Sequence, residues 1–105
     1  MNSSVQAFKD QVAVVTGASS GIGKAIALGL AAQGAMLCLV GRRLDALQAV
    51  AESARATALR VLCHRIDLTL DEDIQELTAR LRRDYGYIDL LIQRAGVISL
   101  GQLES

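Results

Sequence analysis

Four short apolar runs, separated by longer segments with a different hydrophobic period, most constrain how this chain can fold. Most of these residues are aliphatic, and the third run becomes more polar toward its end, as suits the edge of a sheet. Short continuous apolar runs are typical of strands buried on both faces of a parallel sheet. We therefore expect strands at residues 12–15, 36–40, 60–66 and 88–92.

The three intervening segments place apolar residues at the spacing of an amphipathic helix. The first begins at Gly21 and ends near Gly34, a residue type common just past a helix end. Thr69 and Glu72 match a capping box, which predicts that the third helix begins there. The apolar faces of the second and third helices are Leu44, Leu47, Val50, Ala51 and Ala54, and Leu70, Ile74, Leu77, Leu81 and Tyr85.

This alternation of strands and helices predicts an α/β fold of the Rossmann type. The order is βαβαβαβ with short connections, which implies a parallel sheet with helices on both faces. The 105 residues suffice for one domain spanning residues 1–105. Because 51% of the residues are hydrophobic and only 3% are aromatic, the core must consist of Val, Ile, Leu and Ala.

Charge and composition argue against several classes of partner. Eleven basic and eleven acidic residues cancel, so no overall field attracts nucleic acid or an anionic membrane surface. The most apolar stretch, residues 25–40, is interrupted by Gln33 and Gly34 and is too short to span a bilayer. Residues 1–4 lack the pattern of a secretory signal, so we expect a cytoplasmic location. Cys38 and Cys63 show no metal-ligand spacing and are interpreted as buried, reduced core residues.

A glycine-rich loop, Thr16 to Gly23, lies between the first strand and the first helix. Such a loop lets backbone amides approach a pyrophosphate, and the helix N-terminus adds N–H donors and partial positive charge. Gly17 would form the turn, Gly21 would allow close approach of a ligand, and Gly23 would let the helix pack on the strand. The alternative is an ordinary tight turn, but the flanking strand and helix favour nucleotide binding.

The octet T-G-A-S-S-G-I-G closely resembles the cofactor loop of the classical short-chain dehydrogenase/reductase family. The resemblance runs from Val12 to about Gly101 and includes Asp67-Leu68-Thr69 and Ala95-Gly96. It implies the N-terminal, cofactor-binding half of an oxidoreductase, with strands ordered 3-2-1-4. It also implies that Asp67 lies beside the adenine ring and Ala95-Gly96 near the adenosine ribose.

Arginines at the end of the second strand predict the choice of nicotinamide cofactor. A site for NAD usually has Asp or Glu there to bind the ribose 2′-hydroxyl, whereas this chain has Gly41-Arg42-Arg43. A guanidinium pairs with the 2′-phosphate of NADP through charge-assisted hydrogen bonds, so we expect NADP(H) to be preferred. Arg42 is the stronger candidate, and Ser19 could assist; the alternative is that both arginines are merely solvated. The predicted cofactor-binding residues are Gly17, Ser19, Ser20, Gly21, Ile22, Gly23, Arg42, Arg43, Asp67, Leu68, Ala95 and Gly96.

Catalytic residues of the family are missing from these 105 residues. The resemblance implies a serine, a tyrosine and a lysine four residues after that tyrosine, and no Y-x-x-x-K occurs. Tyr85 is better interpreted as a packing residue and Tyr87 as a loop anchor. We also note Gln93-Arg94, where the family usually has Asn-Asn before Ala-Gly.

Two further predictions concern the edges of the sheet. His64 has no neighbours suggesting a triad or metal site, and it is interpreted as a partly exposed residue at a strand end. The fourth strand, normally interior in the family, would be an unpaired hydrophobic edge, which predicts a homodimer through that edge. The competing interpretations are a truncated NADP-dependent oxidoreductase, a dinucleotide-binding module without turnover, and an assembly module without catalytic role.

Overall fold

A computed structural model describes residues 8–18, 21–58, 60–93 and 96–99 of the chain. Strands and helices alternate through these residues as the sequence predicts, and a further strand follows the fourth one. The elements are β1 (Val12–Thr16), α1 (Gly21–Ala32), β2 (Met36–Gly41), α2 (Leu44–Ala54), β3 (Val61–Arg65), α3 (Asp71–Asp84), β4 (Leu90–Gln93) and β5 (Gly96–Ser99).

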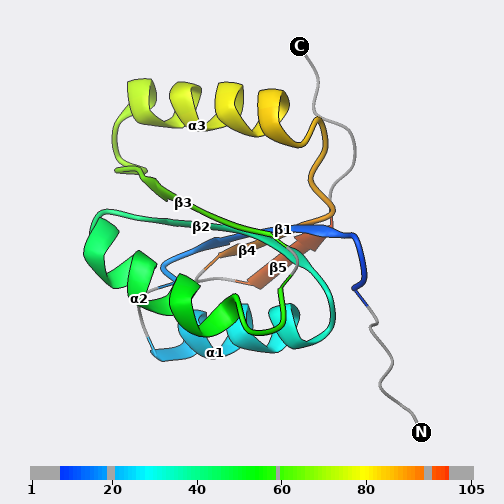
Figure 1. Cartoon of the computed structure of the whole chain (residues 1–105). Helices are drawn as coiled ribbons and strands as arrows, with labels where there is room; N and C mark the ends of the chain where they lie inside the picture. Colours follow the sequence, from blue (N-terminus) through cyan, green and yellow to red (C-terminus); the bar gives the residue numbers. More distant parts are fainter. Residues whose placement is uncertain (1–7, 19–20, 59, 94–95, 100–105) are drawn as a thin grey trace, which may run out of the picture.

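One sheet organises the described part of the molecule, with strand order β3-β2-β1-β4-β5 (Figure 1). The first four of these strands are parallel, which confirms the predicted order 3-2-1-4. Val14 on β1 is paired with Cys38 on one side and Leu91 on the other, so β1 is central. Helices cover both faces of the sheet, which explains why β1 is apolar throughout.

The fifth strand corrects one prediction. β5 pairs with β4 antiparallel, with Leu91 opposite Ile98 and Gln93 opposite Gly96. β4 therefore has a hydrogen-bonded neighbour on each side, and the unpaired hydrophobic edge predicted from the sequence does not exist. A homodimer through the β4 edge loses its physical basis, because the backbone groups that would join two copies are already paired.

Two apolar cores lie on opposite faces of the sheet, which confirms the helices on both faces. Helices α1 and α2 cover one face and α3 covers the other (Figure 1). Successive side chains of a strand point to opposite faces, so each strand supplies both cores. On β2, for example, Leu37 and Leu39 pack with α1 and α2, whereas Cys38 and Val40 pack with α3.

The helix ends agree with the sequence at one point and differ at another. Gly34 follows α1 with φ +90°, and the amide of Ala35 donates to the carbonyl of Leu30, closing the helix as predicted. The prediction of a capping box at Thr69 and Glu72 is wrong. Leu70 is the cap residue without a side-chain hydrogen bond, and Thr69 donates backward to Asp67 instead of accepting from the helix.

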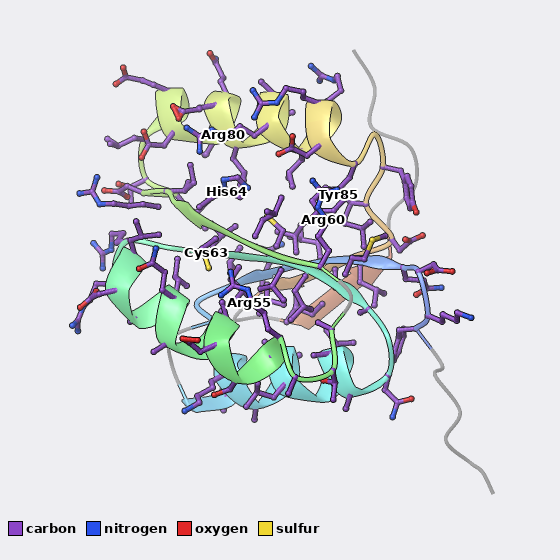
Figure 2. The ribbon with its side chains drawn as sticks, in the orientation of Figure 1. Arg55, Arg60, Cys63, His64, Arg80 and Tyr85 are labelled. Atoms are coloured by element: carbon purple, nitrogen blue, oxygen red, sulfur yellow. The ribbon has the colours of Figure 1, made fainter. Side chains whose placement is uncertain are left out.

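His64 is buried, with 6% of its surface exposed, so its prediction as a partly exposed residue is wrong. It points from β3 toward α3, where its Nδ1 lies 3.3 Å from the guanidinium of Arg80 (Figure 2). Burial, followed by the positive charge of Arg80, lowers the pKa of His64. Cys63 points to the opposite face, toward α2. Both cysteines are free, and Cys38 is buried whereas Cys63 is half-buried.

None of the helices in the described ranges is both long and apolar enough to cross a membrane.

Candidate nucleotide-binding site

The predicted cofactor residues that the structure describes lie near the ends of the four parallel strands, and we name this region the carboxyl edge (residues 16–17, 41–42, 66–67 and 93). Backbone hydrogen bonds hold the tips of neighbouring strands together. The amide of Gly17 donates to the carbonyl of Val40 at 3.1 Å, and the amide of Ile66 donates to that of Gly41 at 2.8 Å. The hydroxyl of Thr16 donates to the carbonyl of Ile92 at 3.2 Å. Segments distant in sequence thus form one surface.

Gly17 and Gly23 of the glycine loop have the turn conformation and the close packing that the sequence predicts. Gly17 has φ +66°, a left-handed conformation that favours glycine at this turn. A Cβ atom at Gly23 would lie only 2.2 Å from the carbonyl oxygen of Gly17, so this position packs the helix directly against the loop backbone. A Cβ atom at Gly21 would meet nothing within 4 Å. The space beside Gly21 is therefore available to a ligand.

The first turn of α1 carries no negative charge of its own. It contains no acidic residue, so no carboxylate of that turn neutralises its partial positive charge. Ile22 in this turn has 79% of its surface exposed, although it is a large apolar residue. Ser19 and Ser20, which the sequence also places in this site, lie outside the described residues. The turn combines N–H donors with an exposed apolar side chain, as contact with a nucleotide requires.

The two arginines after β2 are not equivalent. Arg43 is the cap residue of α2, and its guanidinium lies 3.6 Å from the carboxylate of Asp45 in the first turn of that helix. Both side chains are largely exposed, so this pair is screened by water. Arg42 is exposed as well and precedes the helix. Asp45 was not among the predicted site residues, and it engages part of the charge of Arg43, which leaves Arg42 as the better candidate.

Asp67 organises the turn between β3 and α3. One carboxylate oxygen accepts hydrogen bonds from the hydroxyl and the amide of Thr69, at 2.6 and 2.9 Å. These bonds lower the pKa of Asp67, and the charges of Arg42 and Arg65 lower it further, so the carboxylate is ionised at neutral pH. The amide of Asp67 donates to the carboxylate of Asp73 at 2.8 Å. Sequence reasoning missed Asp73, although an acidic residue in the first turn of a helix was a usable signal.

Leu68 and Gly96 extend the site along the carboxyl edge. Leu68, next to Asp67, has 45% of its surface exposed. Gly96 begins β5 and is paired with Gln93, the last residue of β4. Ala95 lies outside the described residues, as does Arg94.

The two tyrosines have structural roles, as predicted. The hydroxyl of Tyr85 donates to the carbonyl of Leu37 at 3.3 Å, and the guanidinium of Arg60 lies 5.0 Å from the centre of its ring (Figure 2). Burial raises the pKa of the Tyr85 hydroxyl above its ordinary value. Tyr87 donates to the carbonyl of Asp10, which precedes β1. Both hydroxyls thus bond to the backbone away from the carboxyl edge, and the described residues hold no cluster of three metal-ligating side chains.

Comparison with known proteins identifies the family of this chain. Residues 11–105 match the family model described as short chain dehydrogenase, and the chain belongs to this family. An uncharacterized oxidoreductase of Listeria monocytogenes is 38% identical over 91 residues, which are 87% of this chain and 37% of that protein.

Solved structures give the same result. The L-sorbose reductase of Gluconobacter frateurii, complexed with NADPH and L-sorbose, is 39% identical with a TM-score of 0.78, covering 85% of this chain and 34% of that one. NAD+-bound xylitol dehydrogenase is 33% identical with a TM-score of 0.76, covering 80% and 32%. The chain therefore spans only about a third of the length of each of these three relatives.

Proposed function

We propose that this chain binds the adenosine-phosphate part of NADP(H) at the carboxyl edge and forms the N-terminal, cofactor-binding part of an NADP-dependent oxidoreductase. The observation that carries this proposal is Arg42, exposed at the tip of β2 directly after Gly41, where a site for NAD would have a carboxylate. The open space at Gly21 and the first turn of α1, which has no acidic residue, support binding of a pyrophosphate near Arg42.

The family includes structures with either cofactor. L-sorbose reductase was solved with NADPH and xylitol dehydrogenase with NAD+, so family membership alone does not decide between the two. The decision depends on charge at the tip of β2. A carboxylate there would repel the 2′-phosphate, whereas the guanidinium of Arg42 attracts it and supplies paired N–H donors.

In this proposal the chain holds the cofactor and does not by itself complete the reaction. Bound NADP(H) would donate or accept hydride, with a carbonyl compound or an alcohol as the other reactant. The general acid of such a reaction must reach the reacting oxygen, and both tyrosines of this chain are bonded to backbone carbonyls elsewhere. The second candidate is a module that binds the dinucleotide or assists assembly without turnover.

Calorimetric titration of the 105-residue chain with NADP and with NAD tests the proposal, using the variant Arg42→Asp. We expect this change to weaken NADP binding by about tenfold or more, because it exchanges an attractive charge for a repulsive one, and to change NAD binding by no more than about twofold. Arg55→Asp makes the same change in charge at the opposite end of α2, at its C-cap, and serves as the control. Equal losses for NADP and NAD in Arg42→Asp would contradict the proposed preference.

A second titration separates nucleotide binding from a role in assembly alone. If NADP and adenosine 2′,5′-bisphosphate both fail to bind or to raise the melting temperature at millimolar concentration, nucleotide binding is refuted and the assembly role gains support. Binding of both ligands supports the cofactor role.

A further inference from the structure

We propose that Arg65, the last residue of β3, is a second guanidinium of the 2′-phosphate subsite and binds that phosphate together with Arg42. This inference rests on the proposed function and assigns to the subsite a residue that comes from a different strand. Nothing in the sequence pattern pointed to Arg65, because it lies far along the chain from the arginine pair after β2.

The register of the sheet brings Arg65 to the tip of β2. Arg65 is the direct partner of Gly41 in the parallel ladder between β2 and β3. The amide of the next residue, Ile66, donates to the carbonyl of Gly41 at 2.8 Å, so the two strand ends are held together at this position. Arg42 follows Gly41 immediately. The two arginines therefore extend from adjacent strand ends at the carboxyl edge.

The face of the sheet on which Arg65 lies follows from two observations. Cys63, two residues earlier, packs on the side of α2, and His64 points to the opposite side (Figure 2). Alternation along the strand then places Arg65 on the α2 side. Its ladder partner Gly41 faces the same way, because a Cβ atom there would lie 3.3 Å from the side chain of Leu47 on α2. Arg65 is thus on the face where α2 begins.

Gly41 leaves Arg65 without a side chain opposite it in the ladder. Cross-strand partners in a sheet normally contact each other through their side chains, but Gly41 has none to cover Arg65. Arg65 is accordingly exposed. The buried side chain of Leu47 fills the space above Gly41, so an anion that both guanidiniums bind must lie beyond the strand tips and not over Gly41.

The charges around this point also favour an anion. Neither Arg42 nor Arg65 forms an ion pair with a carboxylate in the described part of the chain, whereas Arg43 pairs with Asp45. Both arginines lower the pKa of Asp67, and one oxygen of that carboxylate already accepts hydrogen bonds from Thr69. Both guanidiniums are therefore free of a direct ion pair among the described residues, and a phosphate would supply the missing anionic partner.

A competing role for Arg65 is protection of the sheet edge. β3 is the outermost strand on its side, and an exposed charge there would hinder pairing with another chain. The two roles differ in one measurable respect: a charge that protects an edge has no reason to distinguish ligands with and without a 2′-phosphate.

The test compares two ligands that differ only in the 2′-phosphate, adenosine 2′,5′-bisphosphate and adenosine 5′-monophosphate, by calorimetric titration of the 105-residue chain. We expect Arg65→Gln to weaken binding of the bisphosphate by about three- to tenfold and that of the monophosphate by less than about twofold. Arg65→Lys keeps the charge but loses the planar fork, so it should lose less. Arg55→Gln removes one positive charge at the C-cap of α2 and should change neither affinity.

The outcomes separate this inference from the function on which it rests. If the unaltered chain binds neither ligand, the proposed function fails. If it binds the bisphosphate more tightly, and Arg42→Asp removes that advantage while Arg65→Gln leaves it intact, the role of Arg65 is overturned and the proposed function stands. Circular dichroism of each variant shows whether the fold is retained, and a folded Arg65→Gln protein with an unchanged ratio of affinities overturns the inference by itself.

Discussion

Gly23 offers the sharpest test of how the glycine loop is built, because the contact that an alanine would make there is known. In Gly23→Ala the new methyl carbon would lie 2.2 Å from the carbonyl oxygen of Gly17, 2.9 Å from its carbonyl carbon and 3.2 Å from the Cα of Ala18. All three atoms belong to backbone, so no flexible side chain can move aside. Either the loop or the first turn of α1 must shift.

The size of the effect follows from this geometry. An ordinary contact between carbon and a carbonyl oxygen is about 3.3 Å or longer, so the helix and the loop must separate by about 1 Å. Overpacking of this kind usually costs about 1–3 kcal/mol of unfolding free energy. An alanine inside a helix gains back about 0.5–1 kcal/mol relative to glycine, and we therefore expect a net loss of about 1–2 kcal/mol. The shift should also move the loop amides and weaken NADP binding.

Gly29 provides a matched control within the same helix, since a Cβ atom there would meet nothing within 4 Å. Gly29→Ala should therefore stabilise the protein by about 0.5–1 kcal/mol, through helix propensity alone. Urea denaturation followed by circular dichroism measures both variants. For a domain of this size, a change of 1 kcal/mol corresponds to about 4–8 °C in melting temperature. If Gly23→Ala is as stable as Gly29→Ala, the close packing of α1 on the loop is refuted.

Two further predictions concern buried polar groups. His64 has a lowered pKa in the folded protein, so its protonation favours unfolding. The free energy of unfolding should therefore fall as the pH drops below about 6.5 toward that lowered pKa. In His64→Gln the free energy of unfolding should depend less on pH over this range. Denaturation curves between pH 5 and 8 measure this, and identical slopes in both proteins would contradict it. Asp89 accepts a hydrogen bond from the buried amide of Val12 at 2.7 Å, so Asp89→Ala should lower the unfolding free energy by about 1–3 kcal/mol. Asp89→Asn keeps an acceptor and should lose less in the same urea experiment; equal losses would show that the hydrogen bond is not the cause.

Much of the fold was predictable because its determinants are local. The parallel sheet follows from apolar runs alternating with helical patterns, and these repeat along the chain without reference to distant residues. The positive φ of Gly17 and the tight contact at Gly23 follow from glycine being the residue without a side chain, placed between a strand and a helix. The position of Arg42 at a strand tip follows in the same way from where the second run ends.

Other features depend on which segments meet, and a sequence pattern does not contain that information. The third helix was predicted from spacing that includes Ile74 and Leu77, yet Leu77 is buried while Ile74 has 39% of its surface exposed. Spacing identifies one face of a helix but not how far the sheet beneath that face extends. His64 was expected near solvent and is buried, because α3 packs over it.

The sequence by itself determined the class of fold, the glycine loop and the charge at the end of the second strand, because each depends on neighbours within a few residues. Only the tertiary structure decided that β5 covers the edge of β4 and that Arg65 lies beside Gly41. Strand pairing joins residues separated by any distance along the chain, and its register is set by the packing of whole faces. One arginine of the candidate 2′-phosphate subsite, Arg42, is therefore evident from the sequence. The other, Arg65, is brought beside it by strand pairing.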